Sequence, residues 1–148
     1  MCIEQQFMQG RNKNVEAMTR QRLEQYQSNK AEIRELTCKL HRLGEGDSLI
    51  RSSVILDYKK GYPQPQAVVG YDYGLEMKRR KRYEDRIGKL RAEQDNIEEW
   101  VFGIQDGLTQ RIFRLYFLDG LSQKEVARKV HLDQSCVRIK INDCLKNA

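Results

Sequence analysis

The residues of this chain that could do chemistry are basic and amide side chains near its C-terminus. They lie in the stretch GLSQKEVARKVHLDQSCVRIKI, from Gly120 to Ile141, where two short helical patterns meet at a turn. Residues 107–148 carry 8 Lys and Arg against 4 Asp and Glu, so most of the formal charge of +6 sits in this part of the chain. A basic face of this kind favours a polyanionic partner, although many solvated helices are equally basic.

No part of the sequence has the arrangement of residues that catalysis requires. The chain contains no Ser/His/Asp set, no paired carboxylates in a predicted pocket and no phosphate-cradling glycine loop, and it has only 2 histidines. Cys38 and His41 are close enough to face one metal ion, but a closed zinc site needs four ligands and no second pair has a recognisable spacing. We therefore expect no catalytic residue, no cofactor and no metal site.

The 4 cysteines of the chain indicate a reducing compartment. None of them forms a close CxxC pair, and the N-terminal residues MCIEQQFMQGRNKN lack an apolar run long enough for a signal peptide or a membrane span. Free thiols in a reducing cytoplasm are the simplest account. No membrane partner is expected.

Three short helices are predicted at the C-terminal end. The first covers residues 106–120 and ends at Gly120. The second begins at Ser122, whose side chain can cap the helix together with Glu125. The third begins after a capping residue, Asp133. The apolar faces that could close a small trihelical core are Leu108, Ile112, Leu115 and Tyr116 in the first helix, Val126, Ala127 and Val130 in the second, and Val137, Ile141, Cys144 and Leu145 in the third.

The second and third of these helices have the features of a helix-turn-helix. Two helices that cross closely need a small residue at the crossing, and Ala127 stands at that position. The turn VHLD is short enough to hold the helices at a steep angle. Such a pair pushes its last helix away from the protein body, where the free face can enter the major groove of DNA.

Residues 108–147, LTQRIFRLYFLDGLSQKEVARKVHLDQSCVRIKINDCLKN, resemble the promoter-reading region 4 of bacterial sigma factors. They are still more similar to small phage regulators of late genes, of the RinA and ArpU type. The shared pattern is a helix ending in glycine, the motif GLS, a Glu-Val-Ala core, the capping Asp133 and the final Cys144 and Leu145. His131 stands where the family usually has glycine, and Cys136 where it has Thr, Ser or Arg.

The resemblance implies a role for each exposed residue of this unit. Contacts to base edges are implied for Gln134, Ser135, Arg138 and Ile139 of the last helix. Contacts to DNA phosphates are implied for Gln123, Lys124, Arg128 and Lys140. The alternative is that these residues are the solvated surface of a trihelical module that binds protein. Because no promoter-melting region is present, the resemblance implies a protein that assists RNA polymerase or reads a site by itself, not a complete sigma factor.

Two longer helices must support this unit. Residues 14–43 contain no helix breaker, with Asn14 as a predicted N-cap and Gly44 as the C-terminal glycine. Their apolar seam consists of Tyr26, Ile33, Leu36, Leu40 and Leu43. A second seam, at alternating spacings of four and three, consists of Tyr83, Ile87, Leu90, Gln94, Ile97, Val101, Ile104 and Leu108. Gly103 marks a bend or an end of this helix. The seams could pair as a tethered antiparallel hairpin, or with other copies as a homodimer.

The loop between the two helices, residues 44–74, holds both prolines and 4 tyrosines. It could be a linker that covers the end of the hairpin, with SVILDY as a short strand or helical turn and AVVGYDY as a strand. It could instead be a surface that binds a partner, built from Tyr58, Tyr62, Tyr71 and Tyr73.

The basic run after this loop comprises Lys78, Arg79, Arg80, Lys81 and Arg82. It could hold phosphates as an additional basic patch, or form the solvated start of a helix beside its acidic neighbours.

These observations predict an all-α fold in which a long, coiled-coil-like antiparallel hairpin precedes a trihelical helix-turn-helix unit. The expected divisions are an N-terminal tail at 1–13, the helical hairpin at 14–104 and the DNA-binding unit at 105–148. The expected function is sequence-specific transcription regulation in a phage or prophage, with double-stranded DNA and RNA polymerase as partners. There are two alternatives: a DNA-packaging subunit like the small terminase subunit, and an interaction protein without DNA binding.

Overall fold

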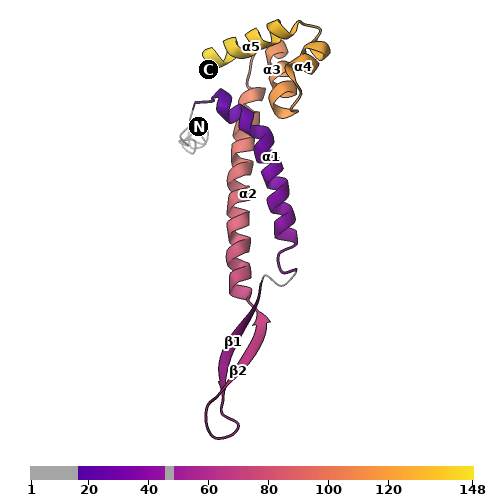
Figure 1. Cartoon of the computed structure of the whole chain (residues 1–148). Helices are drawn as coiled ribbons and strands as arrows, with labels where there is room; N and C mark the ends of the chain where they lie inside the picture. The colour runs from indigo at the N-terminus through magenta and orange to yellow at the C-terminus, as the bar shows by residue number, and fades with distance from the viewer. Residues whose placement is uncertain (1–16, 46–48) are drawn as a thin grey trace, which may run out of the picture. The chain divides into compact units, whose positions relative to one another are not determined.

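The structure, a computed structural model, describes residues 17–45 and 49–148. The predicted tail and the predicted cap at Asn14 lie outside these residues. The elements, shown in Figure 1, are α1 (Arg20–His41), β1 (Ile50–Asp57), β2 (Gln64–Tyr71), α2 (Tyr73–Phe102), α3 (Gly107–Phe113), the π-helical turn η2 (Arg114–Leu118), α4 (Gln123–Val130) and α5 (Gln134–Lys146). The chain is thus mostly helical, as predicted, and its two long helices pack together.

The all-α expectation is wrong for part of the segment 44–74, which contains an antiparallel β hairpin. Strand β1 pairs with β2 from Ile50 opposite Tyr71 to Asp57 opposite Gln64. Strand β1 contains three β-branched residues and β2 contains two, and such residues favour extended backbone. The turn between the strands contains Gly61 with a φ of +81°. Of the two structures considered for SVILDY, the strand is the one that forms.

By its internal contacts, the chain divides into two compact units. One comprises residues 28–95, which we call the hairpin unit. The other comprises residues 17–27 together with those from Asn96 onward, which we call the terminal unit. The terminal unit therefore contains the first turns of α1 and the last turns of α2 as well as the C-terminal helices.

The core of the terminal unit is contributed by all its elements. Phe113 of α3 packs its ring 5.7 Å from that of Trp100 and 5.2 Å from that of Phe117. The buried residues of this core are Leu23, Tyr26, Ile97, Val101, Ile112, Phe113, Phe117, Val126, Ala127, Val130, Val137 and Ile141. The predicted trihelical core forms in part: Leu108 is exposed, and Leu115, Tyr116, Cys144 and Leu145 are only partly buried against it. Side chains from both long helices complete the core.

The predicted helix over residues 106–120 is divided in two. Asp106 caps α3 by accepting hydrogen bonds from the hydroxyl of Thr109 and from its amide, the latter at 3.1 Å. These two bonds lower the pKa of Asp106. After Phe113 the helix widens into the π-helical turn, where the amide of Asp119 donates to the carbonyl of Arg114 at 2.9 Å. Gly120 then ends the segment with a φ of +75°.

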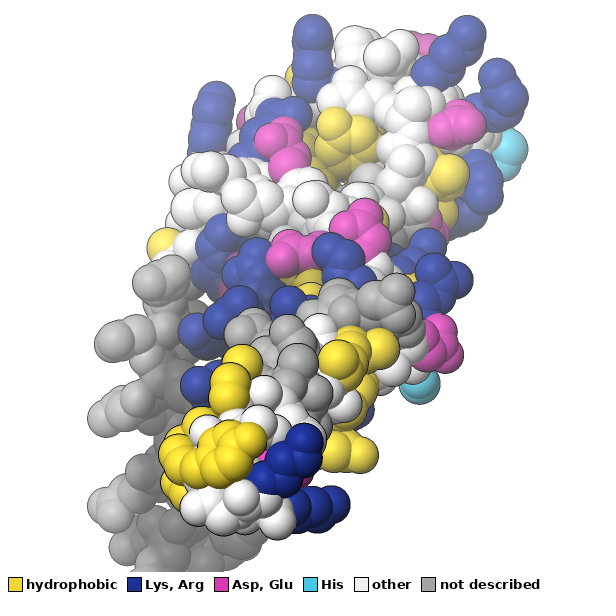
Figure 2. Space-filling view, turned by 60° about the horizontal axis from the view of Figure 1, so that its bottom comes forward, with side chains coloured by type: hydrophobic (Ala, Val, Ile, Leu, Met, Phe, Trp, Pro, Cys, Tyr) yellow, Lys and Arg dark blue, Asp and Glu magenta, His cyan; other side chains and the backbone are white. Residues whose placement is uncertain are grey.

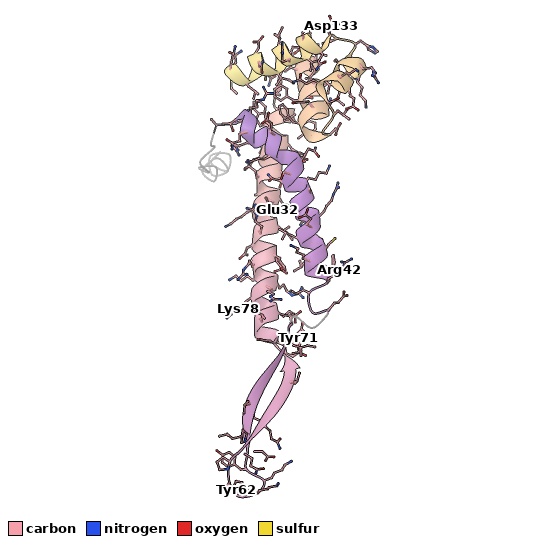
Figure 3. The ribbon with its side chains drawn as sticks, viewed as in Figure 1. Glu32, Arg42, Tyr62, Tyr71, Lys78 and Asp133 are labelled. Carbon is pink, nitrogen blue, oxygen red and sulfur yellow. The ribbon has the colours of Figure 1, made fainter. Side chains whose placement is uncertain are left out.

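In the hairpin unit, α1 and α2 are held by an apolar seam and an ion pair. Ile87 and Leu90 of α2 are buried. Beside them, Arg86 donates two hydrogen bonds, at 2.8 and 3.0 Å, to Glu32 of α1, and this contact lowers the pKa of Glu32. Glu32 is labelled in Figure 3. As predicted, Gly44 follows the end of α1, with a φ of +97°.

Candidate nucleic-acid interface

Helix α4 begins with the capping box that the sequence predicts. The hydroxyl of Ser122 accepts a hydrogen bond from the amide of Glu125 at 3.3 Å, and the amide of Ser122 donates to the Glu125 carboxylate at 2.8 Å. The second of these bonds is the main reason that the pKa of Glu125 is lowered. The start of α4 is therefore fixed by its own sequence.

The turn between α4 and α5 is made by a residue with left-handed backbone. His131 has a φ of 58° and a ψ of 42°, and its amide donates to the carbonyl of Ala127. The amide of Leu132 donates to the same carbonyl at 3.0 Å. Ala127 is 6% exposed, which fits the small residue expected where the two helices cross.

Replacing His131 with glycine is expected to stabilise the terminal unit by about 0.5–1 kcal/mol, because glycine adopts left-handed backbone without strain. The gain is limited because glycine loses more entropy on folding. Urea unfolding, followed by the fluorescence of Trp100, measures the difference. His131→Ala is the matched control, and it should not stabilise; an equal gain from alanine would contradict the argument.

Helix α5 has a buried face and an exposed face. Val137 and Ile141 are fully buried in the core, whereas the residues predicted to contact bases, Gln134, Ser135, Arg138 and Ile139, are all exposed. Asp133 occupies the N-cap position, without a side-chain hydrogen bond to the helix (Figure 3). The predicted base-contacting residues are thus brought together on the solvent side of one helix.

The residues predicted to contact phosphates are more dispersed. Lys124 and Arg128 are exposed on α4, and Gln123 is half-buried at its start. Lys140 is half-buried, about 200° around α5 from Arg138 by the helix periodicity. It lines a hollow of about 700 Å³ together with Asp106, whose pKa it helps to lower. Lys140 therefore lies away from the face that carries Arg138.

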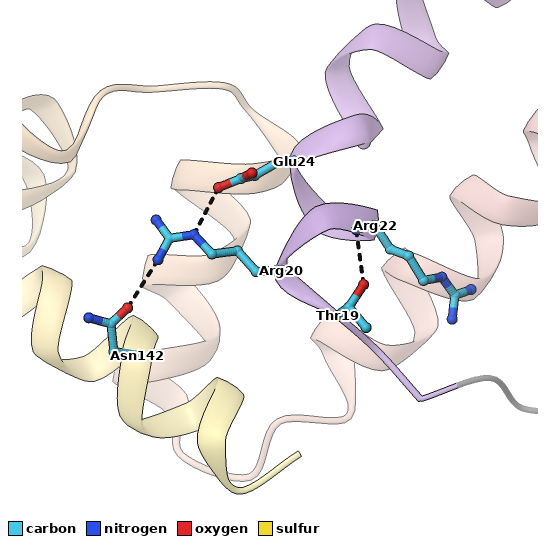
Figure 4. Close-up of polar contacts among 5 residues, drawn as sticks. All are labelled: Thr19, Arg20, Arg22, Glu24 and Asn142. Atoms are coloured by element: carbon cyan, nitrogen blue, oxygen red, sulfur yellow. Dashed lines mark hydrogen bonds and ion pairs between the residues drawn. The ribbon is translucent and has the colours of Figure 1, made fainter.

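One residue beside α5 was missed by the sequence reasoning. Arg20, at the start of α1, donates through its guanidinium to the side-chain oxygen of Asn142 at 3.0 Å and to Glu24 at 2.8 Å (Figure 4). Asn142 lies one helical turn after Arg138. Because Arg20 is 122 residues away from Asn142 in the chain, no local sequence signal could indicate this contact.

The additional basic patch lies in the hairpin unit, at the start of α2. Lys78, Lys81 and Arg82 are exposed, and Arg79 and Arg80 are half-buried. Arg80 forms an ion pair with Glu76 at 3.1 Å. The patch therefore has three exposed cations and two half-buried ones, of which Arg80 is partly neutralised.

No family model matches the chain, and neither a curated protein nor a solved structure is significantly similar to it. Among the described residues, every helix is too short or too polar to span a lipid bilayer.

Proposed function

We propose that this protein is a sequence-specific DNA-binding regulator of transcription, of the phage type, in which α4 and α5 form a helix-turn-helix on a support of two long antiparallel helices. The observation that carries the proposal is the exposed face of α5. It combines a guanidinium, an amide and a hydroxyl, from Arg138, Gln134 and Ser135, on a helix whose opposite face is buried.

Each of these side chains has a defined chemistry toward DNA. The guanidinium of Arg138 donates two parallel hydrogen bonds to a guanine, and the amide of Gln134 both donates to and accepts from an adenine. The exposed Ile139 contacts a thymine methyl group. Lys124 and Arg128 of α4 bind phosphates and fix the register without reading sequence.

The sequence resemblance of residues 108–147 to sigma region 4 supports a role in transcription. A protein of this kind binds its site in the bacterial cytoplasm and contacts RNA polymerase. Helices α4 and α5 belong to the terminal unit, whose core also contains side chains from both long helices.

The test is selection of DNA fragments from a random library with the full chain, followed by binding of the best fragment across a salt series. Arg138→Ala is expected to weaken binding by about 1–3 kcal/mol and to relax the preference at one base pair. The matched control is Arg111→Ala, which removes an exposed arginine of α3 and the same charge. It should leave the base preference unchanged.

Two results would contradict the proposal. Binding that depends on salt alone, without a preferred sequence, indicates DNA packaging or another non-specific role. The absence of binding to any fragment indicates that α4 and α5 form a module that binds protein.

A further inference from the structure

The register of the β hairpin separates its side chains into two unlike faces. Neighbouring residues of a strand point to opposite sides of the sheet, and directly paired residues point to the same side. One face therefore carries Ile50, Val54 and Leu56 of β1 with Pro65, Val69 and Tyr71 of β2. The other face carries Ile55 and Asp57 of β1 with Gln64 and Gln66 of β2.

The apolar face of the hairpin is open to solvent. Val54 and Val69 are each 68% exposed, and Ile50 and Leu56 are also exposed. Antiparallel sheets usually cover one face and leave the other to water, and a lone two-stranded hairpin is only marginally stable. Within the described residues, β1 and β2 form a sheet of two strands without a third.

The apolar face continues onto the start of α2. The ring of Tyr71 contacts that of Tyr73 edge to face, with 4.7 Å between centroids. Tyr73 and Met77, one helical turn apart on α2, are both exposed. Figure 2 shows hydrophobic side chains on the part of the β hairpin that lies toward its turn. We call this surface the apolar strip: Ile50, Val54, Leu56, Val69, Tyr71, Tyr73 and Met77.

Cations lie at both ends of the apolar strip. Lys59 and Lys60 are exposed in the turn of the hairpin, which also contains Tyr62. Tyr62 is labelled in Figure 3. At the other end, Lys81 is exposed one helical turn beyond Met77, and Arg82 follows it. The carboxylate of Asp57 belongs to the opposite face of the sheet. The carboxylate of Glu76, which contacts Tyr71, is neutralised by its ion pair with Arg80 at 3.1 Å. Two copies of the strip would therefore bring like charges together, whichever way they were aligned.

We propose that the apolar strip binds an acidic, amphipathic segment of another protein. Apolar side chains of the segment cover Val54, Val69 and Tyr73, and its Asp and Glu residues lie against the lysines at the two ends. Exposed apolar surface rimmed by charge is the usual character of such a binding site. The inference concerns the hairpin unit and does not depend on the proposed function.

The experiment uses the full chain and a displayed library of random 16-residue peptides. We expect the selected peptides to combine apolar residues with Asp or Glu, and their binding to weaken with rising salt. Val54→Glu is expected to weaken the best peptide about tenfold or more, because it places a carboxylate on the strip and removes an apolar contact.

The matched control is Ile55→Glu. Ile55 is 51% exposed in the same strand, but it points to the other face. Binding should change less than about twofold. Circular dichroism of both variants checks that the helices remain folded. An equal loss of peptide affinity in the two variants would show that the apolar face does not bind the peptide, and would overturn the proposal. So would a selection that gives no peptides, or only peptides without acidic residues.

Two other ligands are tested with the same variants. Binding to vesicles of phosphatidylglycerol and phosphatidylcholine that Val54→Glu removes would assign the strip to a membrane surface, and would also overturn the proposal. A dimer that dissociates on dilution, and that is lost in Val54→Glu but not in Ile55→Glu, would assign it to a second copy of the chain.

Discussion

Replacing Phe113 with alanine is expected to lower the free energy of unfolding of the terminal unit by about 3–5 kcal/mol. Phe113 is fully buried, and its ring lies between those of Trp100 and Phe117. Removing it eliminates apolar burial and leaves a cavity that neighbouring side chains from α2 and the π-helical turn fill only in part. A loss of this size is a large fraction of the stability of a typical domain.

The measurement is urea unfolding, followed both by circular dichroism and by the fluorescence of Trp100, the single tryptophan. The control is Phe102→Ala, which removes the same side chain where it is 55% exposed, with Arg114 above its ring. Its cost should stay below about 1 kcal/mol. Equal costs in the two variants would contradict the core assignment.

Gly120→Val is expected to destabilise the terminal unit by about 2–4 kcal/mol, from two separate causes. The backbone of Gly120 has a φ of +75°, which a β-branched residue adopts only with strain. A Cβ atom at this position would also lie 3.1 Å from the side chain of Gln27. Gln27 donates hydrogen bonds to the carbonyls of Phe117 and Leu118, so a shift of its side chain weakens the link between α1 and the π-helical turn.

The matched substitution is Gly107→Val, in the first position of α3. A Cβ atom there has no neighbour within 4 Å, and the residue is helical. Its effect should lie within about 0.5 kcal/mol of zero, because valine has a somewhat better helix propensity than glycine. Urea midpoints of the two variants give the comparison. If Gly107→Val costs as much as Gly120→Val, neither the strain nor the close approach explains the loss.

The features that the sequence predicted correctly are local ones. The capping box of Ser122 and Glu125, the glycine at position 44 and the end of α2 near Gly103 each depend on side chains and backbone within a few residues. Local chemistry of this kind can be read from the order of the residues alone.

The features that were missed depend on distant contacts. The contact between Arg20 and Asn142 joins opposite ends of the chain, and the apolar strip becomes visible only once the register pairs Val54 with its neighbours in β2. The spacing of apolar residues from 106 to 120 gave no sign of the π-helical turn, because a helix with one wider turn keeps a similar pattern. Tertiary packing decides each of these features.

The make-up of the terminal unit has a consequence for how the protein folds during synthesis. Leu23 and Tyr26 leave the ribosome early. Their core partners, Ile97 and the buried residues of α3 to α5, are synthesised only after residues 28–95. The hairpin unit is therefore complete while the first turns of α1 still lack their partners. A chain that stops before α5, and a fragment that starts at residue 105, each leave part of the same core uncovered. Both are therefore expected to expose apolar surface and to aggregate.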